Sequence, residues 1–116
     1  MDLKRAHERL TAERTQRATL ASKLRADKLG GVGQRQLGHM LKGSETFERH
    51  RDLTALLILE GELHDIDDAL RRMEQGSYGD CEQCSKPIGD ERLDAKPWAR
   101  YCIVHQAEAD KAATRR

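Results

Sequence analysis

Residues 80–105, DCEQCSKPIGDERLDAKPWARYCIVH, place a Cys-x-x-Cys pair ahead of a Cys-x-x-His pair. All three cysteines of the chain lie in this stretch, and seventeen residues separate Cys84 from Cys102. A Cys-x-x-Cys turn presents two sulfurs to one ion, and zinc prefers four thiolate or imidazole ligands in a tetrahedron. The spacing therefore predicts one structural zinc ion per chain, held by Cys81, Cys84, Cys102 and His105.

Two other interpretations of these cysteines are a redox pair and coincidence. A thioredoxin-like Cys-x-x-Cys pair belongs beside a βαβ unit, which this helical sequence does not offer. Four protein ligands leave no position for water, so a closed zinc site of this type is structural. Because every cysteine and the best-placed histidine are committed to the metal, we expect that the chain is not an enzyme.

The rest of the sequence predicts long helices. Charged residues make up 35% of the chain and aromatic residues 3%, a balance typical of helices that bury a narrow apolar seam. A helix over residues 45–75 carries six apolar residues at the alternating spacing of three and four that a coiled-coil seam requires. These six residues are Leu56, Leu59, Leu63, Ile66, Leu70 and Met73.

A first helix is predicted over residues 2–28, which contain neither proline nor glycine. Glu13 and Arg17 interrupt its apolar face, so its seam is weaker. The apolar residues at compatible spacing are Leu3, Ala6, Leu10, Leu20 and Leu24.

The fold class that follows is mainly α. A long antiparallel two-helix coiled-coil hairpin over residues 1–76, with a glycine-rich connection over 29–44, precedes a small zinc finger and a short C-terminal helix over 77–116. Ser44 is a plausible N-cap for the second helix. The alternative to a hairpin that reaches out to a partner is a short coiled coil that only stabilises itself or dimerises. A monomeric protein is favoured.

Two features of the second helix lie outside its seam. Leu57 and Ile58 add apolar surface that the C-terminal helix, the glycine-rich connection or a partner protein would cover. Asp68 and Arg72 are spaced like an ordinary ion pair on a solvated face, as are Asp67 and Arg71.

Charge and hydropathy limit the partners and the location. The chain has 21 Lys and Arg residues against 20 Asp and Glu residues, so it lacks the positive excess of a duplex DNA-binding protein. No segment resembles a signal peptide or reaches the roughly 18 apolar residues of a membrane span. We expect a cytoplasmic protein.

Residues 76–105, GSYGDCEQCSKPIGDERLDAKPWARYCIVH, resemble the zinc-finger region of the DksA/TraR family of bacterial transcription regulators. Ser85 stands where the family has glycine, and His105 replaces the fourth cysteine. The positions that match the family pattern are Tyr78, Gly79, Cys81, Cys84, Ile88, Arg92, Leu93, Ala95, Pro97 and Cys102.

The resemblance implies a protein that binds RNA polymerase, sends its coiled coil into the secondary channel and alters initiation without contacting promoter DNA. Relatives carry an acidic Asp-x-x-Asp-x-Ala motif at the coiled-coil tip, but residues 33–43, GQRQLGHMLKG, contain no acid. The alternative is a zinc-stabilised interaction module that acts on another partner, or on polymerase outside the channel. The candidate partner-binding residues are Arg35, His39, Lys42, Leu57 and Ile58.

Overall fold

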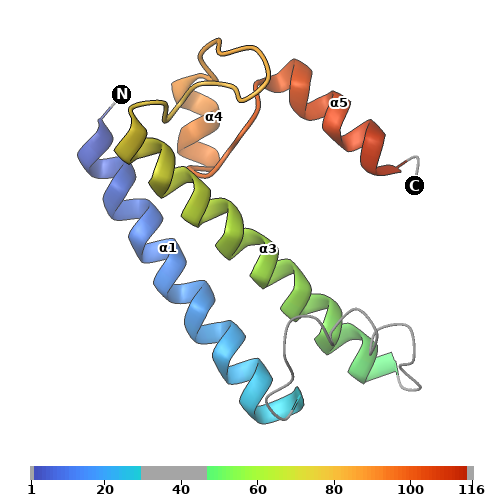
Figure 1. Ribbon diagram of the computed structural model, residues 1–116. Helices are drawn as coiled ribbons and strands as arrows, with labels where there is room; N and C mark the ends of the chain where they lie inside the picture. The colour runs from blue at the N-terminus through green and yellow to red at the C-terminus, as the bar shows by residue number, and fades with distance from the viewer. Residues whose placement is uncertain (1, 30–46, 115–116) are drawn as a thin grey trace. The chain divides into compact units, whose positions relative to one another are not determined.

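The computed structural model describes residues 2–29 and 47–114 and confirms the mainly α fold. Its helices are α1 (Leu3–Leu24), which continues as the π-helical turn η1 (Arg25–Leu29), then α3 (Phe47–Gln75), α4 (Asp90–Ala95) and α5 (Ile103–Thr114) (Figure 1). The described part of the chain contains no strand, only one isolated bridge between Asp80 and Pro87. Within it, no helix combines the length and apolar character needed to cross a bilayer. Ser44, the predicted N-cap, lies outside the described residues.

The chain divides into two compact units, and α1 and α3 contribute to both. The finger unit comprises Met1–Ala12 and Asp65–Arg116, and the hairpin unit comprises Glu13–His64. In each unit the segments of α1 and α3 run antiparallel (Figure 1). The units therefore divide the two long helices, whereas the sequence analysis placed a domain boundary after residue 76. That domain boundary stays a prediction.

The finger unit has a core to which helices and loops both contribute. Leu10 of α1 and Ile66 and Ala69 of α3 are buried in the same cluster as the loop residues around the cysteines. This shared cluster explains why the ends of α1 and α3 belong with the finger. The other buried members are Tyr78, Cys81, Ile88, Leu93, Trp98 and Ala99.

The predicted seam of α3 faces the cores of both units. Leu56 and Ile66 are fully buried, and the other four seam residues are partly buried and pack against the clusters. The hairpin-unit core consists of Ala21, Leu53 and Leu56. Leu53 extends the packed face by one turn beyond the predicted seam.

On α1 the predicted seam needs a correction. Leu20 is 50% exposed and Leu3, the first residue of the helix, is 54% exposed, while Ala21 is buried. Steps of 3.6 residues from the buried Leu10 reach Ala21 and Leu24, because three turns of an α-helix span about eleven residues. Leu20 therefore lies roughly 100° away from the packed face.

The polar interruption of α1 is matched by a charged residue on α3. Arg17 donates from Nε to Glu62 Oε2 at 3.2 Å and also pairs with Glu13. The Arg17 side chain is 17% exposed, so it lies largely out of water between these carboxylates. The break in the apolar seam is thus a layer of paired charges within the hairpin unit.

Gly61 gives a prediction about stability. It lies inside α3, exposed, and an added Cβ would meet nothing within 4 Å. Glycine in a helix interior costs about 0.5–1 kcal/mol relative to alanine. Gly61→Ala should therefore raise the free energy of unfolding by about that amount in urea denaturation. Ala55→Gly, at another exposed site of α3, should lower the free energy of unfolding by a similar amount. A change of the same sign in both variants would contradict this expectation.

Candidate metal centre

The four predicted zinc ligands lie together. The ligand atoms of Cys81, Cys84, Cys102 and His105 are all within 4.8 Å of one another. His105 Nδ1 is 3.6 Å from Cys81 Sγ and 3.2 Å from Cys102 Sγ, and the sulfurs of Cys84 and Cys102 are 3.9 Å apart. Ligand atoms around one tetrahedral zinc lie roughly 3.5 to 3.8 Å apart at bond lengths of about 2.0 to 2.3 Å. Both the donor set and its spacing suit a structural zinc ion.

The first zinc-binding turn is shaped by backbone hydrogen bonds. Cys81 N–H donates to Lys86 O at 2.9 Å, and Ser85 N–H donates to Cys81 O at 2.9 Å. Ser85 has a φ of 62°, in the left-handed region that costs a non-glycine residue about 1–2 kcal/mol. The turn therefore explains why glycine suits this position in the family pattern and why Ser85 is a strained substitute.

The second zinc-binding turn leads directly into α5. Gln106 N–H donates to Cys102 O at 2.8 Å, which fixes the first helical turn against the cysteine. His105 lies in that turn, three residues after Cys102, and residues three apart on a helix share a face. The start of α5 therefore brings the imidazole beside the thiol.

The surroundings of the cysteines adjust their pKa values. Burial disfavours the Cys81 thiolate, but N–H groups of Cys102, Cys84 and Gln83 donate to the sulfur, and the net effect lowers the pKa of Cys81 to about 6. The backbone N–H and the imidazole of His105 lower the pKa of Cys102. Thiolate is the form of cysteine that binds metal, so these two sites favour the binding form.

Arg72 is the residue near this centre that the sequence analysis placed wrongly. It does not lie on a solvated face, because it is 9% exposed and pairs with Glu82 in the first zinc-binding turn. Arg71 is the residue that pairs with Asp68. The repeat of charges along α3 could not reveal a partner beyond the end of that helix.

The predicted partner-binding residues differ in their surroundings, and their role stays a prediction. Arg35, His39 and Lys42 lie outside the described residues. Leu57 is partly buried and packs against the hairpin-unit core, whereas Ile58 is 57% exposed. Of the two α3 residues, Ile58 is therefore the one available to a partner.

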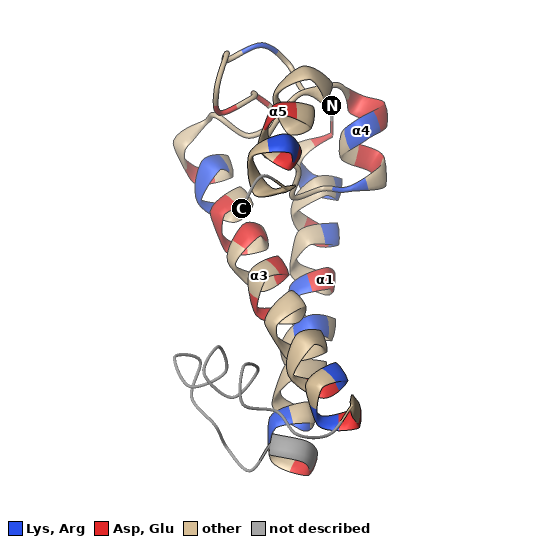
Figure 2. Ribbon diagram, turned by 90° about the vertical axis from the view of Figure 1, so that its right-hand side faces the viewer, with Lys and Arg blue, Asp and Glu red and all other residues tan. Residues whose placement is uncertain are grey.

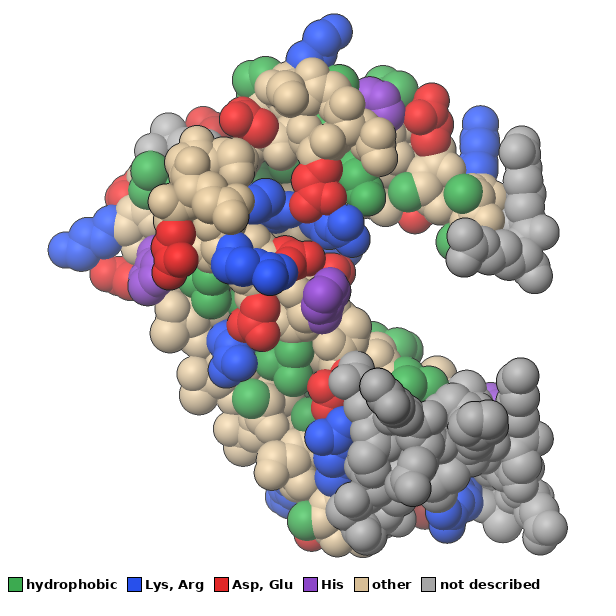
Figure 3. Space-filling view, viewed as in Figure 1, with side chains coloured by type: hydrophobic (Ala, Val, Ile, Leu, Met, Phe, Trp, Pro, Cys, Tyr) green, Lys and Arg blue, Asp and Glu red, His purple; other side chains and the backbone are tan. Residues whose placement is uncertain are grey.

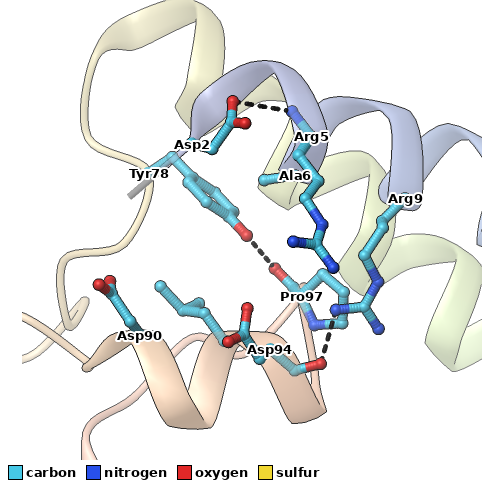
Figure 4. A pocket seen from close by; sticks show the side chains of 9 residues that line it. Asp2, Arg5, Ala6, Arg9, Tyr78, Asp90, Asp94 and Pro97 are labelled. Atoms are coloured by element: carbon cyan, nitrogen blue, oxygen red, sulfur yellow. Dashed lines mark hydrogen bonds between the residues drawn. The ribbon is translucent and has the colours of Figure 1, made fainter.

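A cavity of about 200 Å³ lies in the finger unit, between the start of α1, α4 and the loops (Figure 4). Tyr78 Oη donates to Pro97 O at 2.8 Å and Arg9 donates to Asp94 O at 2.6 Å, and both bonds tie the cavity walls together. Two arginines and three aspartates line the cavity. Because charges of both signs surround it, the cavity favours neither an anion nor a cation.

Comparisons with known proteins agree with this geometry. The prokaryotic dksA/traR C4-type zinc-finger family matches residues 76–110. An RNA polymerase-binding transcription factor DksA from Caulobacter vibrioides is 48% identical over 46 residues, which are 40% of this chain and 32% of that protein. General stress protein 16O from Bacillus subtilis is 34% identical over 80 residues, 69% of this chain and 47% of that protein.

The similarity to a solved structure covers most of this chain. Transcription factor DksA2 from Pseudomonas aeruginosa matches with 26% identity and a TM-score of 0.51, over 97% of this chain and 79% of that one. The chain spans between a third and a half of the length of the curated relatives named above. Residues 76–110 therefore carry a zinc finger of the DksA/TraR type, with His105 at the position of the fourth cysteine.

Proposed function

We propose that this protein binds bacterial RNA polymerase and regulates transcription, and that its helical hairpin enters the secondary channel. The observation that carries the proposal is the DksA/TraR-type finger whose core includes residues of both long helices. Supporting it, the relative from Caulobacter vibrioides is named as RNA polymerase-binding. The proposal places the protein in the cytoplasm as a monomer.

In this proposal the protein acts without sequence-specific contact to DNA. A formal net charge of +1 offers little attraction for phosphate groups. Basic and acidic residues follow one another along the ribbon of the helices (Figure 2), and their side chains are interspersed on the face shown in Figure 3. This mixed pattern is compatible with a protein partner and poor for tracking a nucleic-acid backbone.

The hairpin tip is proposed to modulate binding rather than to act on the catalytic metal. Residues 33–43 carry Arg35, His39 and Lys42 and no carboxylate. Cations repel magnesium and attract the acidic residues that hold it, so a basic tip cannot replace an acidic one. Affinity would then come mainly from the finger and from the hairpin flank, where Ile58 is exposed.

The missing acidic motif also favours a second candidate function. A zinc-stabilised interaction module would keep the finger and the hairpin but use them on another protein, or on polymerase outside the channel. Binding to purified core RNA polymerase tests whether polymerase or another protein is the partner. No binding by the zinc-loaded wild type would reject the proposed function and leave only an interaction module that acts on another protein.

The tip and flank give a prediction for the same assay. Replacing both Arg35 and Lys42 with alanine should weaken polymerase binding several-fold at low salt and less at high salt, because exposed charges are screened. Ile58→Ala should weaken it by a similar factor at any salt concentration, since an apolar contact is lost. Arg14→Ala with Lys23→Ala removes the same charge from exposed positions of α1 in the hairpin unit, outside the finger and the tip, and serves as the control. Unchanged affinity and promoter output in the tip variant would remove the tip from the mechanism.

A further inference from the structure

Glu82 joins three parts of the finger unit through its side chain and backbone. Its carboxylate accepts hydrogen bonds from Nε and Nη2 of Arg100 at 3.1 and 2.9 Å, and it also pairs with Arg72 of α3. Its backbone N–H donates to Arg100 O at 3.0 Å. Glu82 follows Cys81 directly, and Arg100 stands two residues before Cys102. One carboxylate therefore links both zinc-binding turns to α3.

Burial makes this link costly to break. The Arg72 side chain is 11% exposed and those of Glu82 and Arg100 are 29% and 36% exposed. Besides Glu82, Arg72 donates to Ala99 O at a long 3.4 Å. Removing one member of a buried ion pair is strongly destabilising, because the remaining charge stays out of water without compensation. The buried charge of Arg72 is thus compensated only while the first zinc-binding turn holds Glu82 beside it.

The network lies next to the ligands but supplies none of them. Arg100 also stacks near the Tyr101 ring, 5.2 Å from its centroid, and approaches Asp65 of α3 at 3.9 Å. These contacts hold the segment that precedes Cys102 against α3. Groups that orient the ligands of a metal affect its retention even when they do not touch it.

We propose that Arg72, Glu82 and Arg100 form a positioning network that holds the two zinc-binding turns at ligand distance and couples zinc retention to the end of α3. Zinc would hold the two turns together through their ligands, and the network holds them through Glu82 and Arg100. A change at Arg72, on a helix that carries no ligand, should therefore speed the loss of zinc. In return, loss of zinc should loosen α3 over residues 65–75.

The test measures zinc release from the full-length, zinc-loaded protein into excess of a coloured chelator. Arg72→Gln and Glu82→Gln should each raise the release rate about tenfold, the lower end of the effect of outer groups on metal affinity. Arg71→Gln is the matched control, because Arg71 directly precedes Arg72 on α3. Its side chain is 62% exposed and pairs with Asp68. Equal release from the Arg71 and Arg72 variants would overturn the proposal.

Three further variants separate positioning from a general loss of stability. Leu56→Ala removes a buried side chain of the hairpin unit and should lower stability without changing zinc release. Arg72→Lys keeps the charge and should restore part of the slow release. Changing Arg72 and Glu82 together should have little more effect than either change alone, because they act in one network. Fast release from Leu56→Ala would show that zinc retention follows stability alone. Additive effects in the double variant would show that Arg72 and Glu82 do not act in one network.

Discussion

Removal of zinc, by a chelator or by Cys102→Ala, should unfold the finger unit and leave only part of the helical circular dichroism. A structural zinc ion contributes on the order of 10 kcal/mol to a small metal-binding domain, which equals the whole stability of many domains. Most of the residues between Gln75 and Ile103 are irregular, apart from the short α4. Without the metal, little regular structure remains there to hold the buried side chains together.

The packing indicates which helical residues should unfold together with the finger. Leu10, Ile66 and Ala69 share their cluster with the finger loops, so α3 residues 65–75 should lose protection from hydrogen exchange. Residues 47–64 pack in the separate hairpin-unit cluster and should keep more of their protection. The hairpin is thus expected to survive in part.

A neighbouring variant controls for the Cys102 substitution. Val104 is 63% exposed and lies between two zinc ligands in sequence, so Val104→Ala should leave one zinc per chain and an unchanged melting temperature. Metal analysis and thermal unfolding give both readouts. A Cys102→Ala protein that still bound one zinc ion per chain and had the melting temperature of the wild type would contradict the zinc assignment.

The zinc site was predictable from the sequence because its information is local. Two short turns each carry two ligands, and the chemistry of zinc fixes which residue types are used. The same holds for the seam of α3, where helical spacing selects Leu56 and Ile66 as buried. Both predictions rest on patterns that need no knowledge of distant partners.

The remaining features depend on contacts that spacing does not encode. Arg72 had a plausible partner in Asp68 one turn away, but Glu82, beyond the end of α3, binds it in the fold. Leu20 is more apolar than Ala21, yet Ala21 is the residue in phase with the packed face. In both cases the nearest or most apolar candidate was chosen, and the geometry of the partner helix or loop decided otherwise.

Ile66→Ala should lower the free energy of unfolding by roughly 2–5 kcal/mol, the cost of emptying a fully buried large apolar site. Leu63, at the middle of the predicted seam, is only partly buried, so Leu63→Ala should cost less than Ile66→Ala. Urea denaturation of the zinc-saturated protein, followed by circular dichroism, measures both values. Ile58→Ala is the control on the same helix, and its effect should stay within about 0.5 kcal/mol because Ile58 is 57% exposed.

The same variants test whether the finger and the end of α3 share one core. Ile66 packs in the cluster that contains Cys81, so Ile66→Ala should also lower the midpoint of the zinc-dependent unfolding transition. Leu56 is equally buried but belongs to the hairpin-unit cluster, and Leu56→Ala should leave that transition in place. A loss below about 0.5 kcal/mol for Ile66→Ala would mean that the buried face of α3 is wrongly assigned. Equal shifts of the zinc-dependent transition by both variants would mean that the two clusters unfold as one.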